Sequence, residues 1–418
     1  MQAGTGDNQH VAQDDALPRL PVLVLGKSIT ALGVLRVLVG HGLKPYGVES
    51  TSDVVAASRW YEPLPKQLPE TSDSAVLGAF LESLALPEAV LFPCSDSWAT
   101  AVARLAPAVR TRFHACVSPH EAVDQCVDKD RFRELVERLG IPAPRTFAIR
   151  TPADLDRIDA ADLQAGFLKP TNSQRHNRIY GTKGSFFESP RAARQMVEHA
   201  SERGITFMLQ EWIPGGMGKT IILDGFVDRT GTLRALMARR RFRVNPPRLG
   251  NASATMTIPL AEAGDAPENL RRILADVEYR GAFNCEFKLD ERDGRFKIIE
   301  VNPRLAWFVA TLAGAGVDLP WMTYLDALEL PVPTTTSYQL GRYAVYETPD
   351  ASAIVRAWTS MKRPDGPVIR PWLRGDHALF WARDPWPFFQ DIARALRGRV
   401  RKEARRFRRP ARAAAKVG

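Results

Sequence analysis

The chain has 418 residues, of which 45% are apolar and 25% are charged, so it can form two or three packed units of ordinary globular composition. Its net charge of +10 comes from residues 393–418, which hold eleven Lys or Arg and one acid (11 − 1 = +10). The rest of the chain is neutral, which argues against a nucleic-acid-binding fold. The four cysteines form no C-x-x-C pair and no run of 18 apolar residues occurs, so we expect neither a zinc site nor a transmembrane helix, and a cytoplasmic location.

The N-terminal region is predicted to form a parallel, doubly wound sheet. Residues 1–20 are polar and acidic and are expected to be a disordered tail. Apolar strands at 22–25 and 89–92 then alternate with helical segments, as in α/β folds. Gly26, Ser28 and Ala31, with Glu49 after the next strand, partly match a dinucleotide-binding fingerprint. Two of its three glycines are missing, so a structural tight turn is the favoured interpretation and a dinucleotide-dependent oxidoreductase is a minor alternative.

Three lysines occupy positions typical of anion binding. Asp128 is predicted to cap a helix whose first turn contains Lys129, where backbone N–H groups favour an anion. Lys169 closes the short apolar strand 166–170, and Lys183 lies in the polar, basic loop that follows. Each lysine taken singly is equally compatible with an exposed side chain on an ordinary helix, strand or loop.

Two further strands carry candidate binding groups. The strand 206–210 closes on Gln210 and runs into Glu211, Trp212 and Ile213. This segment could bind a purine edge through its main chain or could simply be a strand end. The strand 234–244 places Arg239, Arg241 and Arg243 on one face. Three neighbouring guanidinium groups indicate either bound anions or a solvated basic face.

The segment 281–304 is predicted to be a β-hairpin with its turn at 290–294. A three-residue loop would put Glu286 opposite Glu300, with Asn302 on the same face and Cys285, Phe287, Ile299 and Val301 on the other. Facing acids on a largely buried hairpin require a compensating cation. Carboxylate and amide oxygens favour Mg²⁺, which commonly binds together with phosphate, over the alternative of a solvated acidic edge.

In this order, these elements resemble the ATP-grasp superfamily, in particular its carboxylate–amine ligase branch, which includes D-aspartate ligase-like enzymes. The resemblance covers roughly residues 21–330, and the Glu-Val-Asn-Pro-Arg run at 300–304 is its most specific part. It implies an α/β fold in which an N-terminal Rossmann-like parallel sheet precedes a two-lobed α+β ATP-grasp fold. The expected divisions are a tail at 1–20, a Rossmann-like domain at 21–125, an ATP-grasp domain at 126–330, a C-terminal cap at 331–396 and a basic tail at 397–418.

The resemblance also implies residue roles. Lys129, Lys169 and Lys183 would hold the phosphates of ATP. Glu211 would accept from the adenine amino group, with the adjoining Gln210, Trp212 and Ile213 completing the purine site. Glu286, Glu300 and Asn302 would bind Mg²⁺. The expected catalytic residues are Arg241, Arg243 and Arg304. Arg304 would face the transferring phosphoryl group or the intermediate, and Arg241 and Arg243 match a basic pair placed near the phosphates.

The implied reaction is ATP-dependent activation of a small-molecule carboxylate as an acyl phosphate, followed by attack of an amine and release of ADP and phosphate. A non-catalytic nucleotide-binding protein of the same fold is the main alternative. No nucleic-acid partner is expected, and neither the substrates nor the oligomeric state follow from the sequence. The basic tail either is solvated or makes peripheral contact with the inner face of an anionic membrane.

Overall fold

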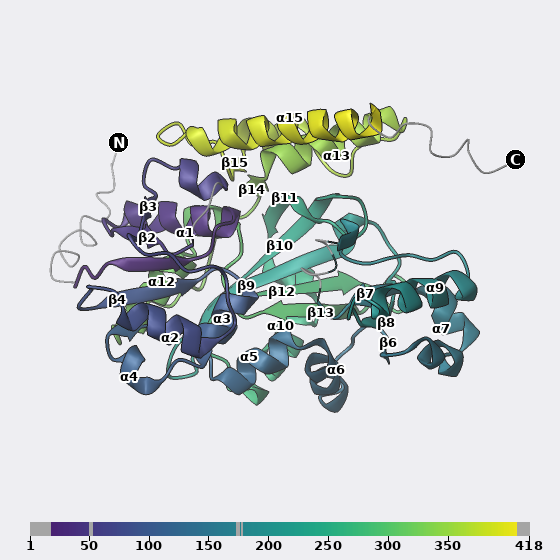
Figure 1. The fold of residues 1–418 in the computed structure, drawn as a ribbon, viewed down its shortest axis with the longest axis horizontal. Coiled ribbons are helices and arrows are strands. Elements are labelled where there is room, and N and C mark those ends of the chain that lie inside the picture. The colour runs from purple at the N-terminus through teal and green to yellow at the C-terminus, as the bar shows by residue number, and fades with distance from the viewer. Residues whose placement is uncertain (1–17, 50–52, 173–175, 177–178, 408–418) are drawn as a thin grey trace, which may run out of the picture.

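The computed structural model of the chain describes residues 18–49, 53–172, 176 and 179–407, which form three β-sheets with flanking helices (Figure 1). The first sheet is parallel throughout, which confirms the predicted doubly wound arrangement. Its strands, in spatial order, are β3 (Glu62–Pro63), β2 (Pro45–Gly47), β1 (Val22–Leu25), β4 (Ala89–Pro93) and β5 (Phe113–His114). The accompanying helices are α1 (Ile29–Gly40), η2 (Val54–Ala57), α2 (Ser74–Glu82), α3 (Asp96–Ala103) and α4 (Pro107–Arg110).

Helix α1 joins this first unit to the rest of the molecule. It is apolar on nearly all sides, because one side packs on the parallel sheet and another packs on α11 (Val309–Gly314) and α12 (Leu319–Ala327). A Cβ atom at Gly33 would lie 3.0 Å from Val309 Cγ2, so the two helices approach closely at a residue without a side chain. The first unit therefore shares a continuous apolar core with the large sheet described below.

The second sheet is small and antiparallel. It consists of β6 (Thr146–Ile149), β8 (Phe207–Glu211) and β7 (Gly166–Pro170), with β8 in the centre. One face is covered by η3 (Pro152–Arg157), α7 (Ala160–Ala165) and α9 (Pro190–Ser201), through a core that includes Leu168, Val197 and Leu209. The opposite face of β7 and β8 is left to line the cavity described below.

The third sheet is the largest. Its strands, in spatial order, are β13 (Phe296–Asn302), β12 (Gly281–Leu289), β9 (Thr220–Val227), β10 (Leu233–Asn245), β11 (Asn251–Ile258), β14 (Tyr343–Val345) and β15 (Asp376–His377). The remaining elements around it are α5 (His120–Val127), α6 (Lys129–Arg138), η4 (Met217–Lys219), η5 (Leu260–Ala263) and α10 (Ala266–Asp276). Leu270 and Ile273 of α10 pack with Phe132 and Leu135 of α6 against the buried face of the hairpin.

The C-terminal segment folds back over the first unit. After β14 come α13 (Glu347–Thr359), α14 (Ile369–Arg374) and α15 (Trp386–Phe407), which runs along one edge of the molecule (Figure 1). Strands β14 and β15 join the large sheet, and α15 continues past the expected boundary at residue 396. The expected basic tail lies outside the described residues from 408 onward, as does the expected N-terminal tail up to 17.

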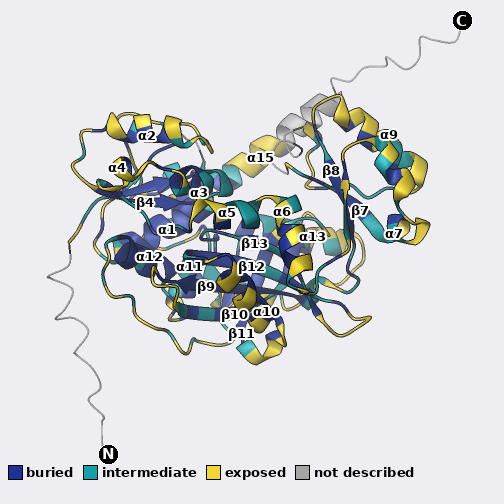
Figure 2. Cartoon of the chain, turned by 90° about the horizontal axis from the view of Figure 1, so that it is seen from below, coloured by how far each residue is buried: buried dark blue, intermediate teal, exposed yellow. Residues whose placement is uncertain are grey.

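The degree of burial differs between the sheets and the helices that cover them. The strands are mostly buried, whereas the outer faces of α2, α9 and α15 are exposed (Figure 2). Pro18 and Leu20, which we assigned to the N-terminal tail, accept hydrogen bonds from Tyr324 Oη. Within the part of the chain that the structure describes, no helix combines the length and apolar content needed to cross a membrane.

Candidate active site

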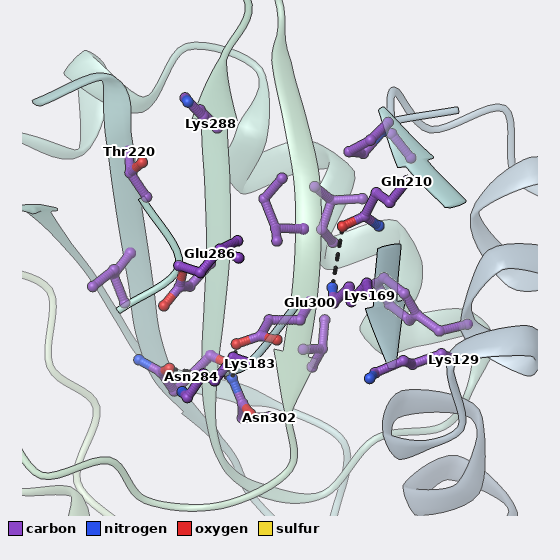
Figure 3. Close-up of a pocket in the computed structure, with 18 of the residues that line it drawn as sticks. Lys129, Lys169, Lys183, Gln210, Thr220, Asn284, Glu286, Lys288, Glu300 and Asn302 are labelled. Atoms are coloured by element: carbon purple, nitrogen blue, oxygen red, sulfur yellow. Dashed lines mark hydrogen bonds between the residues drawn. The ribbon is translucent and has the colours of Figure 1, made fainter. Parts of the chain in front are cut away.

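A cavity of about 760 Å³ lies between the small sheet and the hairpin end of the large sheet. Strands β7 and β8 form one wall and β12 and β13 the other, while the first turn of α6 and Asp96 of the first unit complete it (Figure 3). Twelve of the thirteen predicted site residues line this cavity, and Arg243 does not. The twelve are Lys129, Lys169, Lys183, Gln210, Glu211, Trp212, Ile213, Arg241, Glu286, Glu300, Asn302 and Arg304.

The two strands of the hairpin pair Glu286 with Glu300 as predicted, but the loop has a different length and β13 contains a bulge. Glu286 lies opposite Glu300, as expected. The loop, however, is not the expected three residues, because Asp290 and Arg295 pair through a 2.9 Å backbone hydrogen bond and leave four residues between them. A β-bulge at Ile299 then shifts the register by one residue and restores the alignment of the two acids. The bulge also corrects the predicted inner face: both isoleucines border the cavity, but Ile298 is the one buried in the core, and Ile299 is half-buried.

The two acids are held in different ways. Glu286 Oε2 accepts a hydrogen bond from Arg241 Nη1 at 2.9 Å, and Glu300 Oε1 accepts from Asn302 Nδ2 at 3.3 Å. Withdrawal from water raises the pKa of Glu300, but the charges of Lys169 and Lys183 outweigh this effect and hold that pKa below its usual value. Glu300 therefore stays ionised at neutral pH and directs negative charge into the cavity.

Three lysines surround the same space. Asp128 caps α6 by accepting from the backbone of Asp130 and Arg131 at 2.9 and 3.0 Å, which places Lys129 in the first turn as predicted. Lys129 Nζ donates to Pro170 O, and Lys169 Nζ donates to Gln210 Oε1 at 3.2 Å. Burial, together with the neighbouring charge of Lys169, lowers the pKa of Lys129 to about 7. Like charges gathered beside a cavity in this way are typical of a polyanion-binding site.

Lys183 reaches the cavity from the loop after β7. Its Nζ donates to Asn251 Oδ1, at the start of β11. Residues 173–175 and 177–178 of this loop lie outside the described residues. Lys183 thus links the loop after the small sheet to the large sheet, on the side of Glu300 and Asn302 (Figure 3).

The segment from Gln210 to Ile213 leaves β8 along the cavity. Its glutamate is already engaged: Glu211 Oε1 accepts from Arg292 Nη2 at 2.6 Å, and Oε2 accepts from the backbone of Arg145 at 3.1 Å. Ile213 O accepts from Lys288 Nζ at 2.7 Å. The backbone N–H groups of Glu211 and Trp212 are also used, and donate to Arg145 O and Ala165 O at 2.8 and 2.9 Å.

Two arginines complete the wall near the acids. Arg304 Nε donates to Asp96 Oδ1 at 2.7 Å, and its Nη2 donates to Asn302 Oδ1 at 3.2 Å. Arg241 bridges Glu286 and Thr220 Oγ1, at 2.9 and 3.2 Å. Both guanidinium groups are therefore fixed beside the acid pair by contacts from other strands or from the first unit.

Arg243 is the exception, and its predicted place in the site is wrong. Its guanidinium pairs with the buried Asp350 of α13, with Nε–Oδ1 and Nη2–Oδ2 distances of 2.7 Å, and Nη1 donates to Asp365 O and Pro367 O. The register of β10 shifts on both sides of Arg243, so the period-two argument that grouped it with Arg241 does not extend past the bulge. Arg239, on the same strand, is likewise buried, in an ion pair with Asp224 at 2.7 Å.

Several known proteins are similar to this chain in sequence. A family model described as carbamoyl-phosphate synthase L chain, ATP binding domain, matches residues 264–321, which include the hairpin and Arg304. D-aspartate ligase of Enterococcus faecium is 23% identical over 238 residues, covering 54% of this chain and 56% of the ligase. The carbamoyl phosphate synthase large chain of Methanoculleus marisnigri is 24% identical over 196 residues, which is 45% of this chain. The chain thus matches about half the length of the first relative and 18% of the second.

Solved structures agree on the architecture. N5-carboxyaminoimidazole ribonucleotide synthetase in complex with ADP superposes with a TM-score of 0.59 at 13% identity, covering 82% of this chain and 86% of that one. Biotin carboxylase from Campylobacter jejuni gives 0.57 at 16% identity, covering 78% and 74%. L-amino acid ligase from Bacillus licheniformis gives 0.56 at 14% identity, covering 75% of each chain. The chain has the ATP-grasp fold.

The ATP-grasp fold confirms the predicted fold class. Among the described residues, no group of three or more His, Cys, Asp or Glu is placed to hold a metal ion. Two carboxylates and an amide facing a cavity suit Mg²⁺, which takes one or two protein carboxylates and completes its shell with phosphate oxygens and water. The donors present on β12 and β13 therefore fit a magnesium ion that arrives with a nucleotide.

Two polar residues that line this cavity, Asn284 and Lys288, were missed by the sequence analysis. Asn284 faces the cavity on β12 opposite Asn302, and its Nδ2 donates to Asp224 Oδ1 at 2.7 Å. The period-two spacing from Glu286 could have identified it. Lys288, two residues beyond Glu286 on the other side, lies over the Trp212 ring at 4.6 Å. Burial, with a further contribution from Arg241, lowers the pKa of Lys288 to about 8.

The turn at Gly26 has a structural role. A Cβ there would lie 2.8 Å from Cys94 Cβ, so the close approach of the β1 and β4 ends requires glycine. Glu49, the acid of the partial fingerprint, is 2% exposed and accepts from Trp98 Nε1 at 2.7 Å. Because this carboxylate is committed to the interior of the first unit, the tight-turn interpretation is favoured over a dinucleotide site.

Proposed function

We propose that the protein is an ATP-dependent ligase that activates a carboxylate as an acyl phosphate and joins it to an amine, releasing ADP and phosphate. The observation that carries this proposal is the facing pair Glu286 and Glu300, set across one cavity from Lys129 and Lys169 (Figure 3). Acids on one wall and ammonium groups on another suit a magnesium-bound polyphosphate, with the metal toward the acids and the phosphates toward the lysines.

The chemistry begins with a carboxylate, which is a poor acyl donor. A carboxylate oxygen of the substrate attacks the γ-phosphorus of ATP, and ADP leaves. The amine then attacks the acyl carbon, loses a proton, and displaces inorganic phosphate. Such phosphoryl transfer depends on alignment and charge neutralisation more than on a protein nucleophile.

This chain supplies those two requirements. Lys129, Lys169 and Lys183 would bind the phosphates, and Glu286, Glu300 and Asn302 would hold Mg²⁺. When bound, the ion supplies charge neutralisation for the transferring group. Arg241 and Arg304, which the surrounding contacts already orient, would stabilise the negative charge that develops beside the acid pair.

The purine would lie along the segment from Glu211 to Ile213. The N–H groups of Glu211 and Trp212 donate to other backbone carbonyls, so the purine edge would contact the remaining main-chain groups of this segment. Met208 and Ile299 also line the cavity and offer apolar surface for the ring faces.

The names of the similar proteins support an amino acid as one substrate. One relative is a D-aspartate ligase and one structural neighbour is an L-amino acid ligase. The carboxylate, the amine or both would then be an amino acid. The first unit borders the cavity through Ser28 and through Asp96, which accepts from Arg304, so a polar substrate would bind against this side.

Replacement of Glu300 tests the proposal. We expect Glu300→Gln to lower ADP release that depends on both carboxylate and amine by about 100-fold or more, because a charged ligand of the metal is lost at the reacting phosphate. The assay couples ADP to NADH oxidation and screens amino acids as both substrates. Glu262→Gln is the matched control, because Glu262 is 41% exposed and pairs with Arg240 outside the cavity.

Two outcomes would count against the ligase. Unchanged turnover in Glu300→Gln would remove the proposed metal role. Tight nucleotide binding by the unaltered protein, with no ADP release in any substrate combination, would favour the non-catalytic alternative. Circular dichroism of each variant separates a loss of activity from a loss of fold.

A further inference from the structure

Exposed apolar side chains are concentrated in the C-terminal segment. Among the described residues, ten of the thirteen exposed large apolar side chains lie between Leu340 and Leu396, and the other three are Val76, Ile179 and Met196. Met361 is 97% exposed and Leu373 is 78% exposed. Such clustering on one part of a protein marks a surface that contacts something other than water.

Helix α15 carries an ordered stripe within this segment. Trp386, Phe389 and Leu396 are 64%, 51% and 56% exposed, and their spacing of three and seven residues puts them on one side of a helix. In the sequence, Val400 and Phe407 follow at spacings of four and seven residues. The other side of α15 packs against the protein, because Asp391 is buried and accepts a hydrogen bond from Thr348 of α13. The apolar stripe is therefore not part of the protein core.

The charge exposed by the C-terminal segment that contains the stripe is strongly positive. Within residues 340–398, all of which the structure describes, the exposed acid is Asp365. Exposed basic residues in the same range include Lys362, Arg363, Arg370, Arg374, Arg383 and Arg397. The sequence adds nine Lys or Arg against one acid at 399–418. An apolar stripe with a Trp and a Phe, bordered by arginines, is complementary to an anionic lipid surface.

We propose that α15 docks the protein on an anionic membrane surface, with Trp386, Phe389 and Leu396 inserted among the lipid headgroups and the surrounding basic residues against lipid phosphates. The helix lies on one edge of the molecule, with the sheets that line the cavity to one side of it (Figure 1). Docking by this edge leaves the ATP-grasp site outside the membrane. The proposal does not depend on the proposed ligase activity.

Vesicle co-sedimentation of the full chain tests it. We expect the protein to sediment with vesicles of phosphatidylcholine and phosphatidylglycerol, to sediment poorly with phosphatidylcholine alone, and to be released by high salt. Phe389→Ser combined with Leu396→Ser should reduce the partition coefficient by about tenfold or more, because two inserted apolar side chains are lost. Val76→Ser combined with Met196→Ser removes two exposed apolar residues from α2 and α9, and should bind like the unaltered protein.

Three results would overturn the proposal. The first is no sedimentation with anionic vesicles, and the second is equal binding by the two double variants. The third is a concentration-dependent dimer, detected by light scattering without vesicles, that Phe389→Ser/Leu396→Ser abolishes while no vesicle binding is found. That result would assign the stripe to a second copy of the chain.

Discussion

Lys129 and Lys169 bring two ammonium groups to the same cavity, in a protein whose body is otherwise balanced in charge. Burial and the positive charge of Lys169 lower the pKa of Lys129 to about 7, so part of the charge of Lys129 is lost at neutral pH. Phosphate oxygens at the same place would reverse the effect, since an adjacent anion favours the protonated amine. The lysine therefore couples nucleotide binding to proton uptake.

We predict that ATP binding takes up as much as one proton at pH 8. With a pKa of about 7, Lys129 in the protein without nucleotide is protonated below that pH and neutral above it, whereas the complex keeps it protonated. Affinity is then highest below pH 7 and falls by as much as about tenfold per pH unit above it. Isothermal titration calorimetry in two buffers of different ionisation enthalpy measures the proton uptake directly.

Lys129→Arg is the matched variant for this prediction. Arginine stays protonated throughout this pH range, so its complex should form without the proton uptake of the lysine. Equal uptake in the arginine variant and the unaltered protein would assign the proton to another group. Lys288, whose pKa is about 8, is the next candidate.

At the scale of the element, the hairpin of β12 and β13 depends on one extra residue. The four-residue loop alone would place Glu300 out of line with Glu286, and the bulge at Ile299 corrects the alignment. Two adjacent isoleucines consequently have different environments. Ile298 is 1% exposed in the core beneath the sheet, and Ile299 lines the cavity.

We predict that truncating Ile298 mainly lowers stability and that truncating Ile299 mainly weakens ATP binding. Ile298→Ala should lower the free energy of unfolding by about 2–4 kcal/mol, because it leaves a void in the core. Ile299→Ala should cost less than about 1 kcal/mol, since its side chain is only partly buried, but it should weaken ATP binding. Urea unfolding and nucleotide titration of both variants check this. Equal stability losses would contradict the bulge.

The bulges also mark the limit of what the sequence predicts. Strict alternation is enough to bring Glu286, Glu300 and Asn302 to one face, and capping by Asp128 is enough to place Lys129. Neither bulge has a recognisable signature in this chain, so the side chains of Ile299 and Arg243 are predicted wrongly. The partner of Arg243, Asp350, lies more than a hundred residues further along the chain, and contacts of that range do not follow from local periodicity.

At the scale of the whole molecule, the C-terminal segment is tied to the first unit by a buried ion pair. Asp384 accepts from Arg36 Nε at 3.0 Å, from Ser58 Oγ at 2.8 Å and from the backbone of Arg59 at 2.9 Å. The side chains of Arg36 and Asp384 are 1% and 0% exposed. Arg36 also donates to Leu379 O at 2.8 Å, so the segment before α15 is held at several points.

We predict that Asp384→Ala lowers the free energy of unfolding by about 3–5 kcal/mol, because it leaves the Arg36 charge buried without its acid. Asp376→Ala is the control: its pair with Arg342 has both side chains 29% exposed, and its loss should cost about 1 kcal/mol or less. Combining Arg36→Met with Asp384→Leu should recover part of the stability. Calorimetry and urea titration measure all three. Similar losses for the two single variants would contradict the proposed tie.

The contact between Arg304 and Asp96 joins residues separated by 208 positions in the chain. It places a carboxylate from the Rossmann-like portion directly against the guanidinium that borders the pair Glu286 and Glu300. A chimera that exchanged this portion for its counterpart from another protein would therefore have to bring an acid at the position of Asp96. Exchange of this module is thus constrained by that single side chain as well as by the apolar surface between α1 and α11.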